Sequence, residues 1–174
     1  MTATLEILER LIAFDTVSAK SNLALIEYVE DLLAGWGYTV TRLPDPDGQK
    51  AGLLAQIGPA GAGILLSAHT DVVPVEGQTW ASDPFTLTRR GDRLYGRGSV
   101  DMKGFLACVL ASVPRFQAAG LTRPIHIAFS YDEETGGYGM PVLLRHMAGK
   151  AFRPAVVIVG EPTEMKIITG HKGG

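Results

Sequence analysis

A histidine and an aspartate stand two residues apart at the end of an apolar run, within residues 64–73 (ILLSAHTDVV). The run is short, carries branched residues and follows a turn rich in glycine and alanine, which favours a buried strand over a helix. Because side chains alternate along a strand, His69 and Asp71 point to the same side at its C-terminal end. This arrangement suits a metal-binding imidazole and a carboxylate that orients it. A hydrogen-bonded structural histidine would give the same pattern.

Acidic residues also lie at the ends of three other predicted elements. Asp101 follows a glycine-rich loop and precedes a predicted helix, whose backbone N–H groups it could simply cap. Glu133 and Glu134 follow a second predicted strand, and Glu161 follows a third. Each could alone be an ordinary solvated acid. Since open α/β sheets place their sites at the carboxyl ends of strands, we expect these side chains to meet at one edge.

The adjacent pair Glu133 and Glu134 indicates which kind of site these residues could form. Neighbours on a regular strand face opposite sides, so both reach one site only from an irregular turn, which Gly136 and Gly137 allow. Two carboxylates turned inward raise each other's pKa, and a divalent cation removes that cost. One imidazole with several carboxylates suits zinc, cobalt or manganese. A bridging carboxylate would hold two ions roughly 3.5–4 Å apart, and an acid that is not a ligand could act as a base.

The elements that position these side chains alternate between helices and strands. Helical spacing of apolar residues predicts helices at residues 5–14, 22–34, 102–116 and 140–146. Alternation and branched apolar runs predict strands at residues 38–43, 52–57, 64–68, 123–130, 155–159 and 165–169, with a hairpin over 85–95. This order predicts a three-layer α/β/α fold with a mixed, largely parallel central sheet.

Composition excludes several classes of function. The chain has 174 residues, enough for one domain, and a net charge of −2 without a Lys/Arg cluster, so neither a nucleic-acid nor a membrane partner is expected. No apolar run is long enough to span a membrane, and the N-terminus lacks a signal-peptide pattern. The single cysteine, Cys108, lies in an apolar run and is expected to be buried. A cytoplasmic protein without an internal disulfide fits these features.

Four motifs resemble, in order and spacing, those of a co-catalytic zinc hydrolase family. They are HTDVVP at 69–74, GRGSVDMKG at 96–104, DEE at 132–134 and GEPT at 160–163. The family includes aminoacylases, carboxypeptidase G, succinyl-diaminopimelate desuccinylases and acetylornithine deacetylases. His-x-Asp alone is weakly specific, but four motifs in this order are strongly specific and cover essentially the whole chain. The resemblance implies a zinc-exopeptidase-like catalytic domain over residues 1–174 that hydrolyses amides.

The resemblance also implies the metal ligands. Asp101 would bridge two zinc ions, His69 and Glu161 would complete one of them, and Glu134 would bind the other. Cobalt could replace zinc.

Two further residues take roles from the same resemblance. Glu133 would be the general base, accepting a proton from a water whose pKa zinc lowers toward about 7 and delivering it to the leaving amine. Asp71 would orient His69. The family pattern also implies a cis peptide between Asp101 and Met102.

Within the family, the motifs are most similar to those of the acetylornithine deacetylases, which implies cleavage of N2-acetyl-L-ornithine to L-ornithine and acetate in arginine biosynthesis. Two positions depart from that pattern: Gly137 stands where many such enzymes have cysteine, and Phe105 where a second glycine is common. Another N-acyl amino acid substrate therefore stays open, as for a desuccinylase, an aminoacylase or a dipeptidase. A non-catalytic metal-binding fragment is the remaining alternative.

Members of the family are about twice as long as this chain. They carry a lid and dimerisation domain, and a histidine near the C-terminus that completes the second metal. His126 on a predicted strand, His146 on a predicted helix and His171 at the start of the lid are not expected to replace it. We therefore expect a C-terminally truncated catalytic domain that binds one zinc ion or none and hydrolyses amides weakly or not at all. The full-length enzyme is expected to be a homodimer, and this chain could self-associate.

Overall fold

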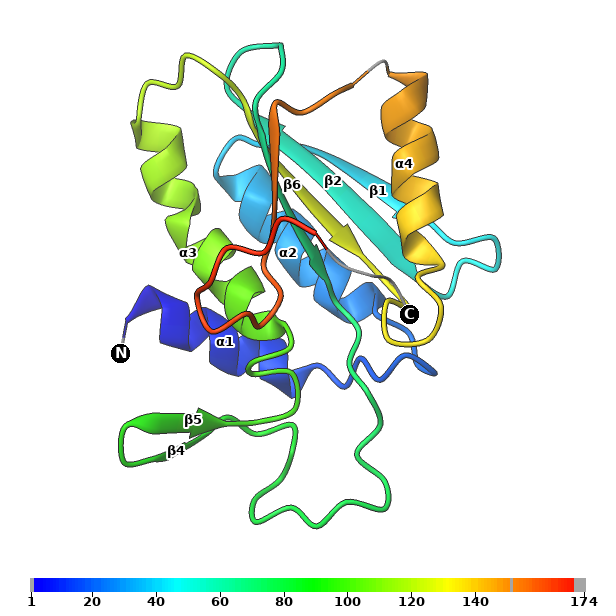
Figure 1. The fold of residues 1–174 in the computed structure, drawn as a ribbon, viewed down its shortest axis with the longest axis vertical. Helices are drawn as coiled ribbons and strands as arrows, with labels where there is room; N and C mark the ends of the chain where they lie inside the picture. The colour runs from blue at the N-terminus through cyan, green and yellow to red at the C-terminus, as the bar shows by residue number, and fades with distance from the viewer. Residues whose placement is uncertain (1, 151, 171–174) are drawn as a thin grey trace.

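A computed structural model describes residues 2–150 and 152–170, so His171 lies outside the described residues. A five-stranded sheet forms its centre, with four helices and a separate two-stranded hairpin around it (Figure 1). In chain order the elements are α1 (Ala3–Ala13), α2 (Leu23–Gly35), β1 (Thr39–Pro44), β2 (Ala51–Ile57), β3 (Ile64–His69), β4 (Thr88–Arg90), β5 (Arg93–Tyr95), α3 (Lys103–Ala118), β6 (Ile125–Ser130), α4 (Gly139–Gly149) and β7 (Val156–Val159).

The central sheet is mixed, as predicted. Its strand order is β1-β2-β6-β3-β7. β2 is antiparallel to both β1 and β6, whereas β3 is parallel to β6 and β7, so β2 alone among these five strands runs the other way. The register pairs His69 with Ser130, and Ser67 with Val159. The carboxyl ends of β3, β6 and β7 therefore lie at one edge of the sheet.

Helices cover both faces of the sheet, which confirms the three-layer α/β/α prediction. Figure 1 shows α1, α2 and α3 on one face and α4 on the other. The larger core forms under the first three helices, where Leu25, Val29 and Leu110 belong to one buried cluster with Ile127 and Phe129 of β6. A smaller core joins α4 to the opposite face. Apolar residues at helical spacing thus bury one stripe of each helix against the sheet.

Two expectations from the sequence are wrong. Cys108 is exposed, because Leu106, Ala107, Val109 and Leu110 take the core-facing positions of α3 and leave it on the solvent side. Residues 165–169 form no strand; the preceding turn puts Met165 at φ 61°, outside the extended region. No helix among the described residues has both the length and the apolar character needed to cross a bilayer.

Candidate metal centre

Three parallel strands bring the predicted ligands to one edge of the sheet. His69 is the last residue of β3, Glu133 and Glu134 follow β6 by a short turn, and Glu161 follows β7. Asp101 lies in the loop just before α3. Because strand register fixes where each chain leaves the sheet, residues far apart in sequence meet here.

His69, Asp101 and Glu161 form the tightest cluster. One donor atom from each lies within 4.8 Å of the other two. The Nε2 atom of His69 is 3.1 Å from Oδ1 of Asp101 and 3.9 Å from Oε1 of Glu161. The imidazole is almost fully buried, whereas the side chains of Asp101 and Glu161 are 48% and 38% exposed. The cluster is thus anchored in the protein and open to solvent on one side.

The two adjacent glutamates lie around this cluster. Oε2 of Glu133 is 4.0 Å from Nε2 of His69, and the Glu133 side chain is 53% exposed. Glu134 is not a member of the three-residue cluster, but it shares with Asp101 the lining of a cavity of about 300 Å³. Asp101 therefore belongs to the cluster and also lines the cavity.

The turn after β6 brings both neighbouring glutamates to the same edge of the sheet. Asp132 adopts a left-handed conformation with φ 59°, and its carbonyl accepts hydrogen bonds from the N–H groups of Gly136 at 3.1 Å and Gly137 at 2.6 Å. Gly137 itself has φ 67°, a conformation that glycine adopts without strain. Lys50 forms an ion pair with the buried Asp132. The irregular turn that the sequence predicted is thus present.

Asp71 holds His69 and the glutamate turn together. Its carboxylate accepts hydrogen bonds from the backbone N–H groups of Glu133 at 3.1 Å and Glu134 at 3.3 Å, and from the Ser18 hydroxyl at 2.6 Å. Nδ1 of His69 lies 2.9 Å from the backbone carbonyl of Asp71 and 3.5 Å from its Oδ1. Since a carbonyl oxygen only accepts, Nδ1 carries the proton and Nε2 faces the acids.

The electrostatics of the site favour a cation. Burial lowers the pKa of His69, but hydrogen bonding to Asp71 and the charges of Asp71 and Glu161 raise it to about 9. Burial raises the pKa of both Glu134 and Glu161, and the charge of Asp101 raises both further. The pKa of Asp71 is lowered, because hydrogen bonds from His69 and Ser18 outweigh its burial. Crowded carboxylates beside one imidazole form a donor set that suits zinc.

Sequence reasoning missed a buried lysine beside the site. Lys103 is fully buried, and its Nζ donates a hydrogen bond to the Phe14 carbonyl at 2.7 Å. Burial lowers the pKa of Lys103 to about 7, against the attraction of Asp15 and Asp71. Its position two residues after the candidate ligand Asp101 was the one feature of the sequence that could have identified it. Lysine is almost never fully buried, so composition and periodicity gave no reason to expect a buried role.

The peptide bond between Asp101 and Met102 is cis, as the resemblance implies. Met102 is fully buried and its sulfur lies 3.2 Å from the backbone nitrogen of His69. Met102 thus joins the loop that carries Asp101 to the end of β3.

Sequence comparison finds relatives over nearly the whole chain. The sequence model of peptidase family M20/M25/M40 matches residues 65–171. Acetylornithine deacetylase from Proteus mirabilis is 38% identical over 176 residues, covering 97% of this chain and 45% of that protein. The protein of the same name from Yersinia pestis is 41% identical over 186 residues, with 97% and 46% covered. The chain thus spans about half the length of the curated relatives it matches.

Structure comparison finds the same fold in enzymes of low sequence identity. An M20 family metallo-carboxypeptidase, Sso-CP2 from Sulfolobus solfataricus, superposes with a TM-score of 0.79 at 23% identity, covering 92% of this chain and 37% of that one. Human carnosine dipeptidase 1 gives a TM-score of 0.77 at 23% identity, with 90% and 37% covered.

Proposed function

Because the chain belongs to peptidase family M20/M25/M40, we propose that its metal centre serves metal-dependent amide hydrolysis. The observation that carries this proposal is the convergence of His69, Asp101 and Glu161, whose donor atoms lie within 4.8 Å of one another at the carboxyl edge of the sheet. A buried imidazole with half-exposed carboxylates matches a hydrolytic site that a substrate can enter.

In this proposal His69, Asp101 and Glu161 would hold one zinc ion, and Asp101 with Glu134 would bind a second. Zinc, or cobalt in its place, supplies Lewis acidity and lowers the pKa of a bound water. Among the residues that the structure describes, His69 is the only imidazole facing these acids. We therefore expect one tightly held ion per chain, and weak hydrolysis by this chain alone.

Glu133 would act as the general base. Its carboxylate is half exposed and lies 4.0 Å from Nε2 of His69, beside the cluster rather than within it. A carboxylate that is not a ligand is free to accept a proton from water and to donate it to the leaving amine. Asp71 supports both parts of the site, since it contacts the His69 ring and the backbone of Glu133.

For the whole protein we infer an N-acyl amino acid substrate, N2-acetyl-L-ornithine, cleaved to L-ornithine and acetate. This inference rests on relatives at 38–41% identity that carry the name acetylornithine deacetylase. It would place the protein in arginine biosynthesis in the cytoplasm. This chain, which spans about half the length of these relatives, contains the candidate metal ligands.

Metal content after dialysis against trace zinc tests the site. We expect about one zinc per chain, lost in His69→Ala and retained in Glu134→Ala and in the exposed control Glu9→Ala. Circular dichroism of each variant would exclude unfolding as the cause of a loss. A parent chain that retains no zinc would contradict the proposed site.

A panel of N-acyl amino acids, assayed with the full-length enzyme as parent, tests the reaction. Glu133→Gln should retain the zinc of the parent and lower the hydrolysis of N2-acetyl-L-ornithine by about 10²–10⁴-fold, the usual contribution of a general base. If the parent cleaves N-succinyl substrates or dipeptides faster than the acetylated amino acid, the inferred substrate is wrong while the metal site stands.

A further inference from the structure

A second cavity lies on the α4 face of the sheet, away from the metal centre. It has a volume of about 620 Å³ and is lined by residues of β1, β2 and β6, the loop before β3 and the C-terminal end of α4. His126, the second residue of β6, borders it, whereas the glutamates of the metal centre follow the other end of the same strand. Four residues at roughly 3.3 Å each separate His126 from the end of β6, about 13 Å.

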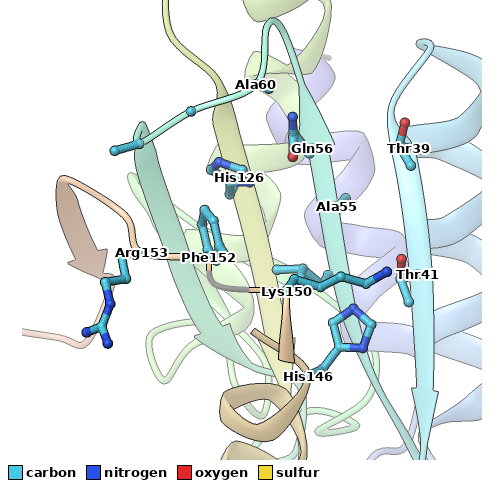
Figure 2. A pocket seen from close by; sticks show the side chains of 13 residues that line it. Thr39, Thr41, Ala55, Gln56, Ala60, His126, His146, Lys150, Phe152 and Arg153 are labelled. Atoms are coloured by element: carbon cyan, nitrogen blue, oxygen red, sulfur yellow. The ribbon is translucent and has the colours of Figure 1, made fainter. Parts of the chain in front are cut away.

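Basic side chains gather at this cavity without an ion-pair partner among the described residues. His146, Lys150 and Arg153 line it, and none of them forms an ion pair within residues 2–150 and 152–170. No aspartate or glutamate lines it in that part of the chain. In Figure 2 the Lys150 side chain extends toward Thr41 and lies near His146, whereas Arg153 points away.

The position of these cations at the end of α4 has an ordinary explanation, because the carbonyl end of a helix attracts positive charge. The helix end alone does not neutralise the cations that line the cavity. The helix end contributes roughly half a negative charge, less than the charge of the lysine and arginine. Lys150 alone therefore carries more charge than the helix end that it lies beside.

A buried histidine also lines the cavity and can report on its occupancy. His126 is only 3% exposed, and its Nε2 atom has no hydrogen-bond partner among the described residues. Its ring packs on Phe152 with centroids 4.1 Å apart. Buried polar atoms in native proteins are nearly always paired.

We propose that this cavity binds a small anionic molecule whose carboxylate or phosphate group contacts Lys150 and His146. The polar remainder of the molecule would meet Thr39, Thr41 and Gln56, which supply hydroxyl and amide groups on the same lining. The volume lies within the range of roughly 300–1,000 Å³ typical of small-molecule sites. The site is separate from the metal centre and does not depend on the proposed hydrolysis.

Histidine side-chain NMR of the metal-free chain provides the test. Inorganic phosphate and citrate are titrated separately at constant ionic strength, one probe for each class of anionic group. We expect saturable shifts of the His126 and His146 ring signals with at least one probe, while the His69 signals stay in place. The probe that saturates identifies the class of ligand.

Two variants separate binding from general screening of charge. Lys150→Gln should weaken the saturating probe at least fivefold. Arg89→Gln, which removes the same charge from the exposed β4–β5 hairpin, should leave its affinity unchanged. Shifts that rise linearly with both probes, or equal losses in the two variants, would overturn the proposal.

Discussion

The carboxylate of Asp71 accepts a hydrogen bond from the backbone N–H of Glu133, at 3.1 Å and across 62 residues of sequence. The same carboxylate lies 3.5 Å from Nδ1 of His69. One buried side chain therefore fixes the imidazole of the metal centre and the turn that carries the candidate base. Asp71 therefore sets the position of His69 relative to Glu133.

Asp71→Asn should damage the site without removing a ligand. The amide oxygen can still accept a hydrogen bond, but the amide nitrogen cannot. A nitrogen in place of Oδ1 leaves the Glu133 N–H without its acceptor, and a nitrogen in place of Oδ2 does the same to Ser18 and Glu134. We expect unfolding in urea to show a loss of about 1–3 kcal/mol, the cost of an unpaired buried group. Zinc affinity should fall about 10–100-fold, as for residues that orient metal ligands.

Asp47→Asn, in the exposed turn before β2, is the matched control and should leave both quantities unchanged. A normal zinc affinity in Asp71→Asn would mean that the strand end alone orients His69.

Gly160 and Phe105 form a contact that the family resemblance did not predict. A Cβ atom at Gly160 would lie 2.0 Å from Cγ of Phe105, so the ring fills the space above this glycine. Gly160→Ala should therefore displace Glu161, the next residue, and lower zinc affinity about tenfold. Zinc titration of Gly160→Ala with and without Phe105→Ala measures this effect.

Because the clash disappears when the ring is removed, the double variant should recover most of the affinity, a non-additive result. Gly149→Ala, where an added Cβ meets nothing within 4 Å, is the control. Equal losses in the single and double variants would show that Phe105 does not set the position of Glu161.

The strand ends of the site could be predicted because local pattern determines them. An apolar run that stops at His69, and others that stop before Glu133 and Glu161, each place a polar group at the carboxyl end of a strand. Parallel pairing then brings those ends together. The Gly136–Gly137 pair likewise predicted the irregular turn, because a backbone position with positive φ favours glycine, and Gly137 has φ 67°.

Two further supports of the site could not be predicted, because each joins residues that are far apart in the sequence and share no local pattern. The Ser18 hydroxyl donates to Asp71 across 53 residues, and the Lys103 ammonium donates to the Phe14 carbonyl across 89. Serine and lysine are mostly exposed, so their burial depends on the assembled fold. Residues 165–169 show the converse error. Their apolar pattern suggested a strand, but Glu164 and Met165 form a turn with φ 53° and 61°, outside the extended region.

Tyr38 should make the fold sensitive to alkaline pH. Its hydroxyl is buried and has no hydrogen-bond partner in the part of the chain that the structure describes. Burial raises the pKa of Tyr38 to about 12, above the ordinary value of 10.0. Between these values the unfolded chain loses the proton first, so the free energy of unfolding falls as pH rises through this window.

Tyr38→Phe removes this contribution and should be near neutral at pH 7, because no hydrogen bond is lost. At pH 11 the variant should be more stable than the parent by about 1 kcal/mol, from one pKa unit of linkage. Urea unfolding at both pH values measures the difference, with the exposed Tyr95→Phe as control. A loss of more than about 1 kcal/mol at pH 7 would indicate a hydroxyl partner.

The strand β7 should drive self-association of this chain. Among the described residues β7 pairs only with β3, and its four residues, Val156–Val159, are all apolar and about half exposed. An exposed apolar edge strand without lysine or proline is a template for pairing with another chain. We expect light scattering to give a mass that rises with concentration.

Val157→Lys should return the mass to that of a monomer, because a charged side chain on the edge opposes pairing. Trp36→Lys, which removes an exposed apolar residue after α2, should leave association unchanged. A parent chain that stays monomeric at every concentration, or equal effects of the two variants, would show that the β7 edge is not the contact.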